Sequence, residues 1–317
     1  MGNVLSRVAD SLYWLGRYSE RIYTNAYIIS VQIDQMLELG RTEKQYEQQW
    51  YSILSICGYI DDFENRYEGY DSNQMLYYVI VDRGNYNSIY RLLESIRNNV
   101  KNTRDCIPNA LFEEWNSIYL AMQESPLQQP INELESMDYL VKVRKKALTA
   151  TGIIDSLMTR DECFQFVKIG KWLERSEKTA LIILKLMENE YLHQDFAINM
   201  TLQVTNTFES YSRQSRSRDV DKVLNFLIGD INCSRSVAYG IKKIKSTIFE
   251  IEQHVIRSYT KQLFEVIDRL EQLISLKATN MTHFERKQWV KEIHQQCMML
   301  GPIFSKTYYL TEPILVK

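Results

Sequence analysis

Apolar residues recur every three to four positions along most of this chain, and that spacing is typical of α-helices that bury one face. Polar segments that contain Gly, Pro, Asn or Asp interrupt the pattern. The pattern predicts helices over residues 4–39, 42–57, 74–81, 87–104, 108–122, 131–158, 159–192, 194–211, 220–228, 234–276 with one break, and 280–300. The polar segment 58–72 is predicted to be a loop, and the tail from Pro302 to be irregular. We therefore expect an all-α fold, a multi-helix bundle with short loops.

The first predicted helix, residues 4–39, is apolar on both sides. Leu12 and Leu15 follow the helical period on one side, while Trp14 and Ile22 lie on the other. A helix that is apolar all round is usually buried by neighbours on several faces. We expect this helix to lie at the centre of the bundle.

Two stretches of the chain resemble each other. At a spacing of 154 positions (170 − 16), the matched residues are Gly16 and Gly170, Glu20 and Glu174, and Arg21 and Arg175. A later block that begins at Asp82 matches one that begins at Asp230, at a spacing of 148 positions (230 − 82). Two matched blocks in the same order favour a tandem duplication over chance similarity between helices. We predict a single domain over residues 1–317, built from two pseudo-twofold-related repeats at approximately 4–125 and 158–257.

Each Gly-x-x-x-Glu-Arg segment places charges in an otherwise apolar helix. Adjacent residues on a helix do not face each other, so Glu20 and Arg21 are not each other's main partner. Arg17 lies three residues before Glu20, and Lys171 lies three residues before Glu174, which is a spacing that allows a local ion pair. Glycine four residues before each Glu leaves space for another backbone or for a ligand.

Two interpretations of these charges remain open. In the structural one, each Glu and Arg bonds with the opposite copy, and losing one partner of such a buried pair costs about 3–5 kcal/mol. In the functional one, the charges line a cleft and Arg side chains hold a carboxylate or phosphate. Glu20 and Glu174 are then candidate general acid/base groups, with Arg21, Arg175 and Arg235 as anion-binding groups. The residues alone favour the structural interpretation.

Composition narrows the class of protein. The chain is 45% hydrophobic and 25% charged with a net charge of −2, which is ordinary for a globular protein and gives no reason to expect nucleic acid or an anionic membrane as partner. No apolar run approaches the roughly 18 residues of a membrane span. The five cysteines form no CxxC pair, so a reducing cytoplasm is the expected location.

No metal or cofactor is predicted. The four histidines lack metal-binding spacing, and the sequence has no phosphate-binding Gly loop or nucleophile elbow. The acidic residues within 58–72 lack the order of an EF-hand, so a solvated loop is preferred over a cation site. A binding protein is therefore favoured over an enzyme.

Several longer motifs stand out beside the two Glu-Arg segments. They are Leu5–Arg21, Thr159–Asp161 with Gly170–Arg175, Asn225–Asp230 with Ser234–Val237, and Arg97–Asp105 with Trp115 and Asn116. Together these motifs resemble the bacterial Alpha-E family, a predicted all-helical domain named for its Glu-Arg motif. The chain departs from the family's pattern at Asn98, Lys101 and Lys171, where the family tends to have Glu, Arg and Arg. Ligand affinity or identity at these positions is expected to differ accordingly.

The resemblance implies a role in peptide chemistry. Members of the family tend to be encoded beside, or fused to, circularly permuted ATP-grasp proteins, and near transglutaminase-like proteases. This context implies an accessory component of a peptide ligation or peptide-processing system, which binds a peptide or such a partner protein. The candidate ligand-binding residues are Arg17, Arg21, Arg97, Arg104, Arg160, Lys171, Arg175 and Arg235. The alternatives are the acid/base enzyme described above and a structural scaffold or oligomerisation module.

Overall fold

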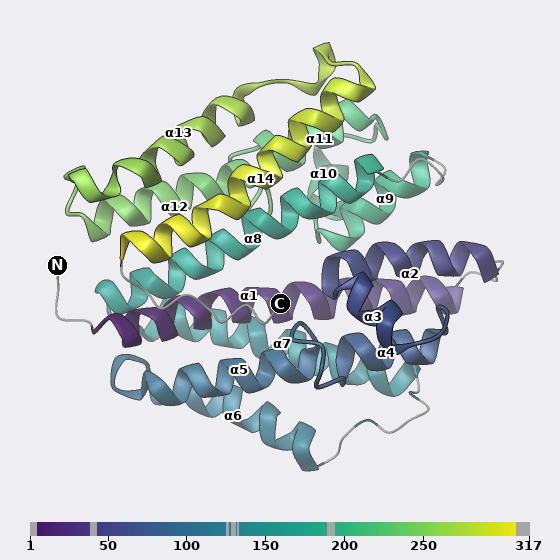
Figure 1. The fold of residues 1–317 in the computed structure, drawn as a ribbon, viewed down its shortest axis with the longest axis horizontal. Coiled ribbons are helices and arrows are strands. Elements are labelled where there is room, and N and C mark those ends of the chain that lie inside the picture. Colours follow the sequence, from purple (N-terminus) through teal and green to yellow (C-terminus); the bar gives the residue numbers. More distant parts are fainter. Residues whose placement is uncertain are drawn as a thin grey trace. The chain divides into compact units, whose positions relative to one another are not determined.

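The computed structural model describes residues 5–38, 43–124, 127, 131, 133–188 and 194–308. These residues form fourteen α-helices and three 3-10 helices, without a strand, which confirms the predicted all-α class (Figure 1). The α-helices are α1 Ser6–Glu38, α2 Glu43–Cys57, α3 Ile60–Arg66, α4 Ser72–Ile80, α5 Ile89–Asn102, α6 Asn109–Glu124, α7 Glu133–Leu157, α8 Glu162–Glu188, α9 Gln194–Val204, α10 Phe208–Gln214, α11 Val220–Gly229, α12 Val237–Ile251, α13 Lys261–Ser275 and α14 His283–Thr307. No helix of the described residues has the length and apolar character that a membrane crossing requires.

The chain divides into two compact units. The first unit comprises Met1–Arg17 and Thr159–Lys317, and the second comprises Tyr18–Met158. Helix α1 runs without a break from Ser6 to Glu38, so the boundary between the units falls inside this helix. The first three turns of α1 therefore belong to the same unit as the C-terminal half of the chain.

In the first unit, α8 packs against α12 and α14, and α13 packs against both α12 and α14 (Figure 1). The sequence explains the central position of α8, because apolar residues surround it on several sides. Val167, Ile169, Leu173 and Ile183 are all buried. Burying each such side chain contributes about 1.5–3 kcal/mol, so α8 is an anchor for the helices around it.

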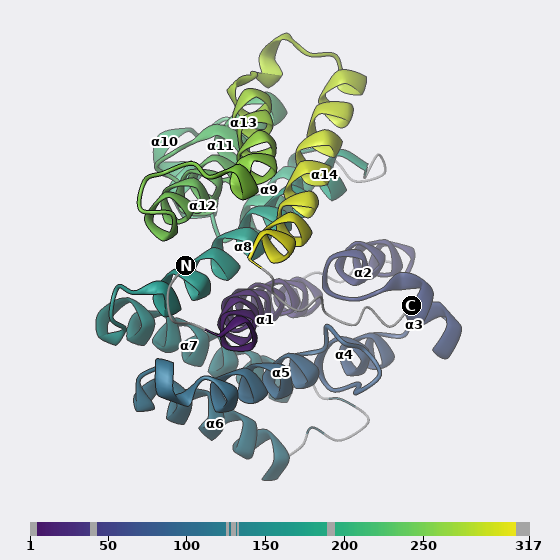
Figure 2. The ribbon, with the colours of Figure 1, turned by 60° about the vertical axis from the view of Figure 1, so that its left-hand side comes forward.

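In the second unit, α5 packs against α4 and α6, and α6 packs against α7. Helices α2, α3 and α4 gather beside one another (Figure 2). Trp50, Trp115 and Tyr78 are fully buried there, which gives this unit an aromatic core of its own.

The prediction of a loop over residues 58–72 was wrong in part, because this segment contains helix α3. Asp61 and Asp62 occupy the first turn of α3 and Arg66 its last turn, where each charge is favourable to the helix dipole. Phe63 is fully buried and ties the short helix to the core. No group of His, Cys, Asp or Glu suited to a metal ion occurs among the described residues, here or elsewhere.

The predicted helix over 194–211 is divided into α9 and α10, and the ends of two other helices differ from the prediction. Helix α8 begins at Glu162 rather than at Thr159, because the carboxylate of Asp161 accepts a hydrogen bond from the Phe164 N–H at 3.3 Å and caps the helix. Helix α14 continues through Pro302 to Thr307. Proline inside a helix is unfavourable, but Phe304 beyond it is fully buried, and that burial favours continuation.

Candidate functional site

Helices α1 and α8 touch at two glycines. A Cβ atom at Gly16 would lie 2.1 Å from the carbonyl oxygen of Val167, and one at Gly170 would lie 2.0 Å from the carbonyl oxygen of Tyr13. Both distances are far below any real carbon–oxygen contact. Only glycine fits at these two positions, and the predicted space beside each glycine is filled by the backbone of the other helix.

Arg17 lies at this crossing, and all of its guanidinium nitrogens donate to protein groups. Its Nε donates to Glu174 Oε2 at 2.7 Å, its NH2 to Glu177 Oε2 at 2.7 Å, and its NH1 to the Tyr13 hydroxyl at 3.1 Å. Gly301 of α14 makes room for this group, because a Cβ there would lie 2.9 Å from NH1. We call Tyr13, Arg17, Glu174, Glu177 and Gly301 the Arg17 cluster, and it joins α1, α8 and α14.

The Arg17 cluster is buried and charged. The side chain of Arg17 is 7% exposed, and that of Glu174 is 1% exposed. Burial lowers the pKa of Arg17, but Tyr13, Glu174 and Glu177 outweigh burial and raise this pKa well above its ordinary value. Burial also raises the pKa of Tyr13, whose hydroxyl thus remains protonated at neutral pH. A permanent cation faces two carboxylates, and this arrangement holds helices together.

The two candidate acid/base groups are both buried. Glu20 is 5% exposed and belongs to the second unit, while Glu174 is 1% exposed and belongs to the first. The expected pairing of a motif glutamate with a basic residue of the other helix is found at Arg17 and Glu174. The local pair between Lys171 and Glu174 stays a prediction.

The two motif arginines, Arg21 of α1 and Arg175 of α8, donate hydrogen bonds to the loops that precede α5 and α12. Arg21 donates to Asn87 Oδ1 at 3.1 Å, and Arg175 donates to the Ser234 carbonyl at 3.2 Å. Each also lies over an aromatic ring of its own helix, Arg21 over Tyr18 at 5.7 Å and Arg175 over Trp172 at 4.8 Å. Both are partly exposed, so they brace a loop and still reach solvent.

The remaining candidate cations divide between the units. In the first unit, Lys171 lies over Trp172 at 5.1 Å, Arg160 over Phe164 at 4.1 Å, and the carbonyl of Arg235 accepts from the Thr179 hydroxyl at 2.9 Å. In the second unit, Arg97 donates to Asn116 Oδ1 at 2.9 Å, and Arg104 lies over Phe112 at 4.3 Å. Five of the eight candidate cations, Arg17 included, therefore belong to the first unit, and three, Arg21 included, belong to the second.

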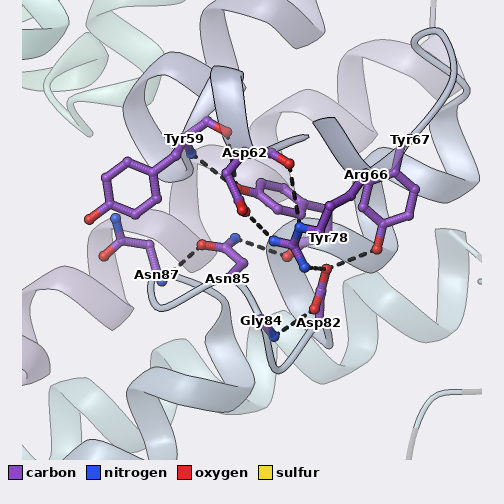
Figure 3. Close-up of polar contacts among 9 residues, drawn as sticks. All are labelled: Tyr59, Asp62, Arg66, Tyr67, Tyr78, Asp82, Gly84, Asn85 and Asn87. Carbon is purple, nitrogen blue, oxygen red and sulfur yellow. Dashed lines mark hydrogen bonds and ion pairs between the residues drawn. The ribbon is translucent and has the colours of Figure 1, made fainter. Parts of the chain in front are cut away.

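A second polar cluster in the second unit was missed by sequence reasoning (Figure 3). Arg66 of α3 donates to Asp82 Oδ2 at 2.8 Å and also to the carboxylate of Asp62. The Tyr67 hydroxyl donates to Asp82 at 2.8 Å, and the Tyr78 hydroxyl donates to Asp62 at 2.9 Å. Burial and these carboxylates raise the pKa of both tyrosines above the ordinary value. We call these five residues the Arg66 cluster.

The Arg66 cluster continues towards Arg21. Asp82 Oδ1 accepts from the Gly84 N–H at 2.7 Å, and Asn85 Nδ2 donates to the Tyr78 carbonyl at 2.9 Å (Figure 3). Asn85 Oδ1 in turn accepts a hydrogen bond from the N–H of Asn87, and the side chain of Asn87 accepts the hydrogen bond from Arg21. The polar chain thus fixes the turn before α5. The four-residue spacing of Asp62 and Arg66 was the sequence signal that could have predicted the Arg66 cluster.

A scan against protein-family models decides the classification. The model of the Alpha-E family, described as a predicted alpha-helical domain with a conserved ER motif, matches residues 4–309. The chain belongs to the Alpha-E family. No curated protein and no solved structure gave a significant match to it.

The Glu-Arg residues of the family description lie on α1 and α8, the two helices that touch at Gly16 and Gly170. This Alpha-E chain has Glu-Arg pairs at Glu20–Arg21 and Glu174–Arg175. In the second of them, the glutamate pairs with a buried arginine of another helix and the arginine braces a loop. Both residues thus contact other segments of the chain.

Proposed function

We propose that this Alpha-E chain is an accessory, non-catalytic component of an ATP-grasp-linked peptide ligation or peptide-processing system, in which it binds a peptide or the partner protein. One observation carries the proposal, namely the Arg17 cluster. Arg17 donates from Nε, NH1 and NH2 to Glu174, Tyr13 and Glu177 within the protein. Charges that are paired within the protein in this way stabilise the contacts between helices. A peptide or a partner protein would then be bound by other residues, on the surface. A cytoplasmic location remains our prediction.

The acid/base alternative fits this geometry less well. A general acid or base must reach its substrate at about hydrogen-bond distance. Glu174 is 1% exposed and bonded to Arg17, and Glu20 is 5% exposed. A buried carboxylate that holds a buried arginine matches a structural role, because separating the two leaves an uncompensated charge.

We also propose that the fourteen helices of the described residues are two copies of a seven-helix repeat, α1–α7 and α8–α14. Helices α3 and α10 both have 7 residues, and α7 and α14 both have 25. This repeat is longer than the segments 4–125 and 158–257, because it includes α7 in the first copy and α13 and α14 in the second.

Matching contacts support the repeat. Asp82 Oδ1 accepts from the N–H two residues later at 2.7 Å, and Asp230 Oδ1 does the same at 2.8 Å. Asn25 donates to the Asn87 carbonyl, as Thr179 does to the carbonyl of Arg235. Phe63 and Tyr78 pack at 5.2 Å and 70°, and Tyr211 and Phe226 at 5.2 Å and 63°.

Matching burial supports the inclusion of the last helices. At a spacing of 150 positions (290 − 140), buried residues of α7 correspond to buried residues of α14. The pairs are Leu140 and Val290, Val143 and Ile293, Ala147 and Cys297, and Ala150 and Leu300. The reciprocal contact of Gly16 and Gly170 supports a pseudo-twofold relation, since a twofold axis makes residue i meet j where j meets i.

The functional proposal is tested by reconstitution. The chain is used as bait for a circularly permuted ATP-grasp protein, and ATP-dependent peptide ligation is then measured with and without the chain. We expect retention of the ATP-grasp protein and a change in ligation rate of about tenfold, the usual scale of a 1.4 kcal/mol coupling. Unchanged ligation and no retention would contradict the proposal.

The Glu20→Gln variant separates the binding component from the enzyme. The two side chains have nearly the same shape, so the variant removes the acid/base group and little else. We expect full stimulation by the variant if its helical circular dichroism matches that of the parent chain. Loss of ligation by a folded variant would favour the acid/base alternative.

A further inference from the structure

Two arginines of the second unit lie on neighbouring tyrosine rings, where α5 packs against α6 (Figure 1). The guanidinium of Arg83 lies over the ring of Tyr90 at 4.6 Å, and that of Arg97 lies over the ring of Tyr119 at 4.4 Å. Gln123 Nε2 donates to both tyrosine hydroxyls, to that of Tyr90 at 2.8 Å and to that of Tyr119 at 2.9 Å. One amide thus joins the two rings and the cations on them. We call these five residues the Arg83–Arg97 site.

Both arginines keep hydrogen-bond donors for a ligand. Among the residues that the structure describes, neither Arg83 nor Arg97 forms an ion pair with a carboxylate. Arg97 donates from Nε to Asn116 Oδ1 at 2.9 Å, while its NH1 and NH2 bond to none of the described residues. Arg83 is exposed and Arg97 is half-buried. Two guanidinium groups on one polar network are therefore available at the surface of α5 and α6.

The rings restrain these guanidinium groups before a ligand binds. A long side chain that moves freely in solution loses conformational entropy when it binds a ligand. A cation over an aromatic ring is already attracted to that ring, so less freedom remains to be lost. For Arg97 the hydrogen bond to Asn116 is a second restraint, and it leaves the edge formed by NH1 and NH2 as the pair of parallel donors.

The carboxylates close to these arginines in sequence have other partners. Glu94 of α5 bonds to Arg91, and Glu114 of α6 bonds to Lys146 at 3.0 Å. These two pairs neutralise their own charges and leave those of the Arg83–Arg97 site uncompensated.

We propose that the Arg83–Arg97 site binds an acidic peptide segment through two neighbouring carboxylates, one on each guanidinium. This inference rests on the proposed peptide-binding function and names the class of peptide and the residues that bind it. Arginine binds a carboxylate by charge-assisted hydrogen bonds from two parallel donors. Two guanidinium groups, each held on its own ring, match two singly charged groups that are adjacent in a peptide.

The surrounding charge argues against nucleic acid as the ligand. Nucleic acids bind chiefly through many phosphate contacts to an excess of cations. The segment 83–124 contains as many acidic as basic residues, namely Arg83, Arg91, Arg97, Lys101 and Arg104 against Glu94, Asp105, Glu113, Glu114 and Glu124. This balance gives a phosphate backbone no general attraction, and it favours a ligand with few charges that the two arginines contact directly.

The test is the binding of a fluorescently labelled peptide amide, Gly-Glu-Glu-Gly, to the full chain, measured by anisotropy. The site is weakened by Arg83→Gln with Arg97→Gln. The matched control is Lys142→Gln with Lys145→Gln, which removes the same charge from the same unit at two exposed lysines of α7. Neither of these lysines lies over a ring or forms an ion pair among the described residues. Helical circular dichroism establishes that both double variants are folded.

We expect the Glu peptide to bind and its affinity to fall with salt. The site variant should lose about tenfold in affinity, because two charge-assisted contacts are removed, and the control should stay within about twofold. The same peptide with Gln in place of both Glu residues should bind at least about tenfold more weakly to the parent chain. The proposal is overturned if the Glu peptide does not bind, if the Gln peptide binds equally well, or if both double variants weaken binding equally.

Two further measurements test the geometry. Tyr119→Leu keeps both charges but removes the ring under Arg97, so it should weaken binding by about twofold to fivefold. An affinity equal to that of the parent chain would overturn the ring-held site. A peptide with one phosphoserine in place of the two Glu residues carries a similar charge on a single group. Tighter binding of this phosphopeptide with the same sensitivity to Arg83→Gln and Arg97→Gln would overturn the assignment to carboxylates.

These outcomes are distinguishable from failure of the proposed function. If the Glu peptide binds as expected but the ATP-grasp protein is not retained and ligation does not change, the Arg83–Arg97 site stands and the ligation role falls. If the partner is retained and ligation changes but the Glu peptide does not bind, only the acidic-peptide inference falls.

Discussion

Arg17 shares one guanidinium among three partners of different chemistry. Two are carboxylates and one is a tyrosine hydroxyl, and the three come from both α1 and α8. Glu174 is almost completely buried, while the side chain of Glu177 is 28% exposed and is partly hydrated. The energetic cost of losing Arg17 is therefore concentrated on Glu174.

Substitution Arg17→Met should destabilise the fold by about 3–5 kcal/mol, because it removes the guanidinium that faces the buried Glu174 carboxylate. The double substitution Arg17→Met with Glu174→Met removes both charges and should recover most of this loss. Chemical denaturation of the two variants and the parent measures both effects. A double variant no more stable than the single would show that the cluster acts through shape instead of charge.

At the scale of the helices, the contact of α1 with α8 depends on the absence of two side chains. Gly16→Ala and Gly170→Ala should each cost about 1–3 kcal/mol or more, because the new methyl group meets a backbone carbonyl that cannot move independently. The two costs should be similar, since the two approach distances are 2.1 and 2.0 Å. Thermal or urea unfolding of each variant provides the measurement.

Gly152 is the matched control for these substitutions. It lies inside α7, and a Cβ there would meet nothing within 4 Å. Gly152→Ala should therefore raise stability by about 0.5–1 kcal/mol, the ordinary effect of alanine in a helix. Equal responses at Gly16 and Gly152 would contradict the close helix contact.

Helical periodicity was sufficient to predict the fold class and most helices, because the apolar stripes of helices such as α5 and α13 are local in sequence. It was not sufficient for α3, since seven residues with three acidic groups do not form a recognisable stripe. The sequence pattern alone predicts an end of the helix before Pro302, because the burial of Phe304 depends on contacts with residues distant in sequence, such as Tyr13.

The candidate site was predictable only in part. The Gly-x-x-x-Glu-Arg repeat indicated a helix pairing and the roles of Gly16 and Gly170. The partner of Glu174 was not evident, because Arg17 lies 157 residues away in sequence. Glu177 and Gly301 lie in no motif, and Tyr13 lies in the motif Leu5–Arg21 without a predicted role. Only the packing of α1, α8 and α14 brings the three together.

At the scale of the whole molecule, the units are not continuous in sequence. Residues 1–17 belong with residues 159–317, so a cut between Met158 and Thr159 leaves the C-terminal fragment without Tyr13 and Arg17. Fragment 159–317 alone should thus be unstable, and co-expressed fragment 1–158 should rescue it. Co-purification of the two fragments is the measurement, with fragment 18–158 as the control that lacks the rescuing segment. Equal rescue by fragment 18–158 would contradict this assignment.

The division inside α1 has a consequence for synthesis on the ribosome. The first turns of α1 leave the ribosome first, but Glu174 is made 157 residues after Arg17. At about 5–20 residues per second, that delay is roughly 8–30 s. During this time Tyr13 and Arg17 have no α8 to pack against, while the residues of the second unit, Tyr18–Met158, are being synthesised. The nascent chain must therefore keep an apolar N-terminal segment from aggregating until translation reaches the helix that covers it.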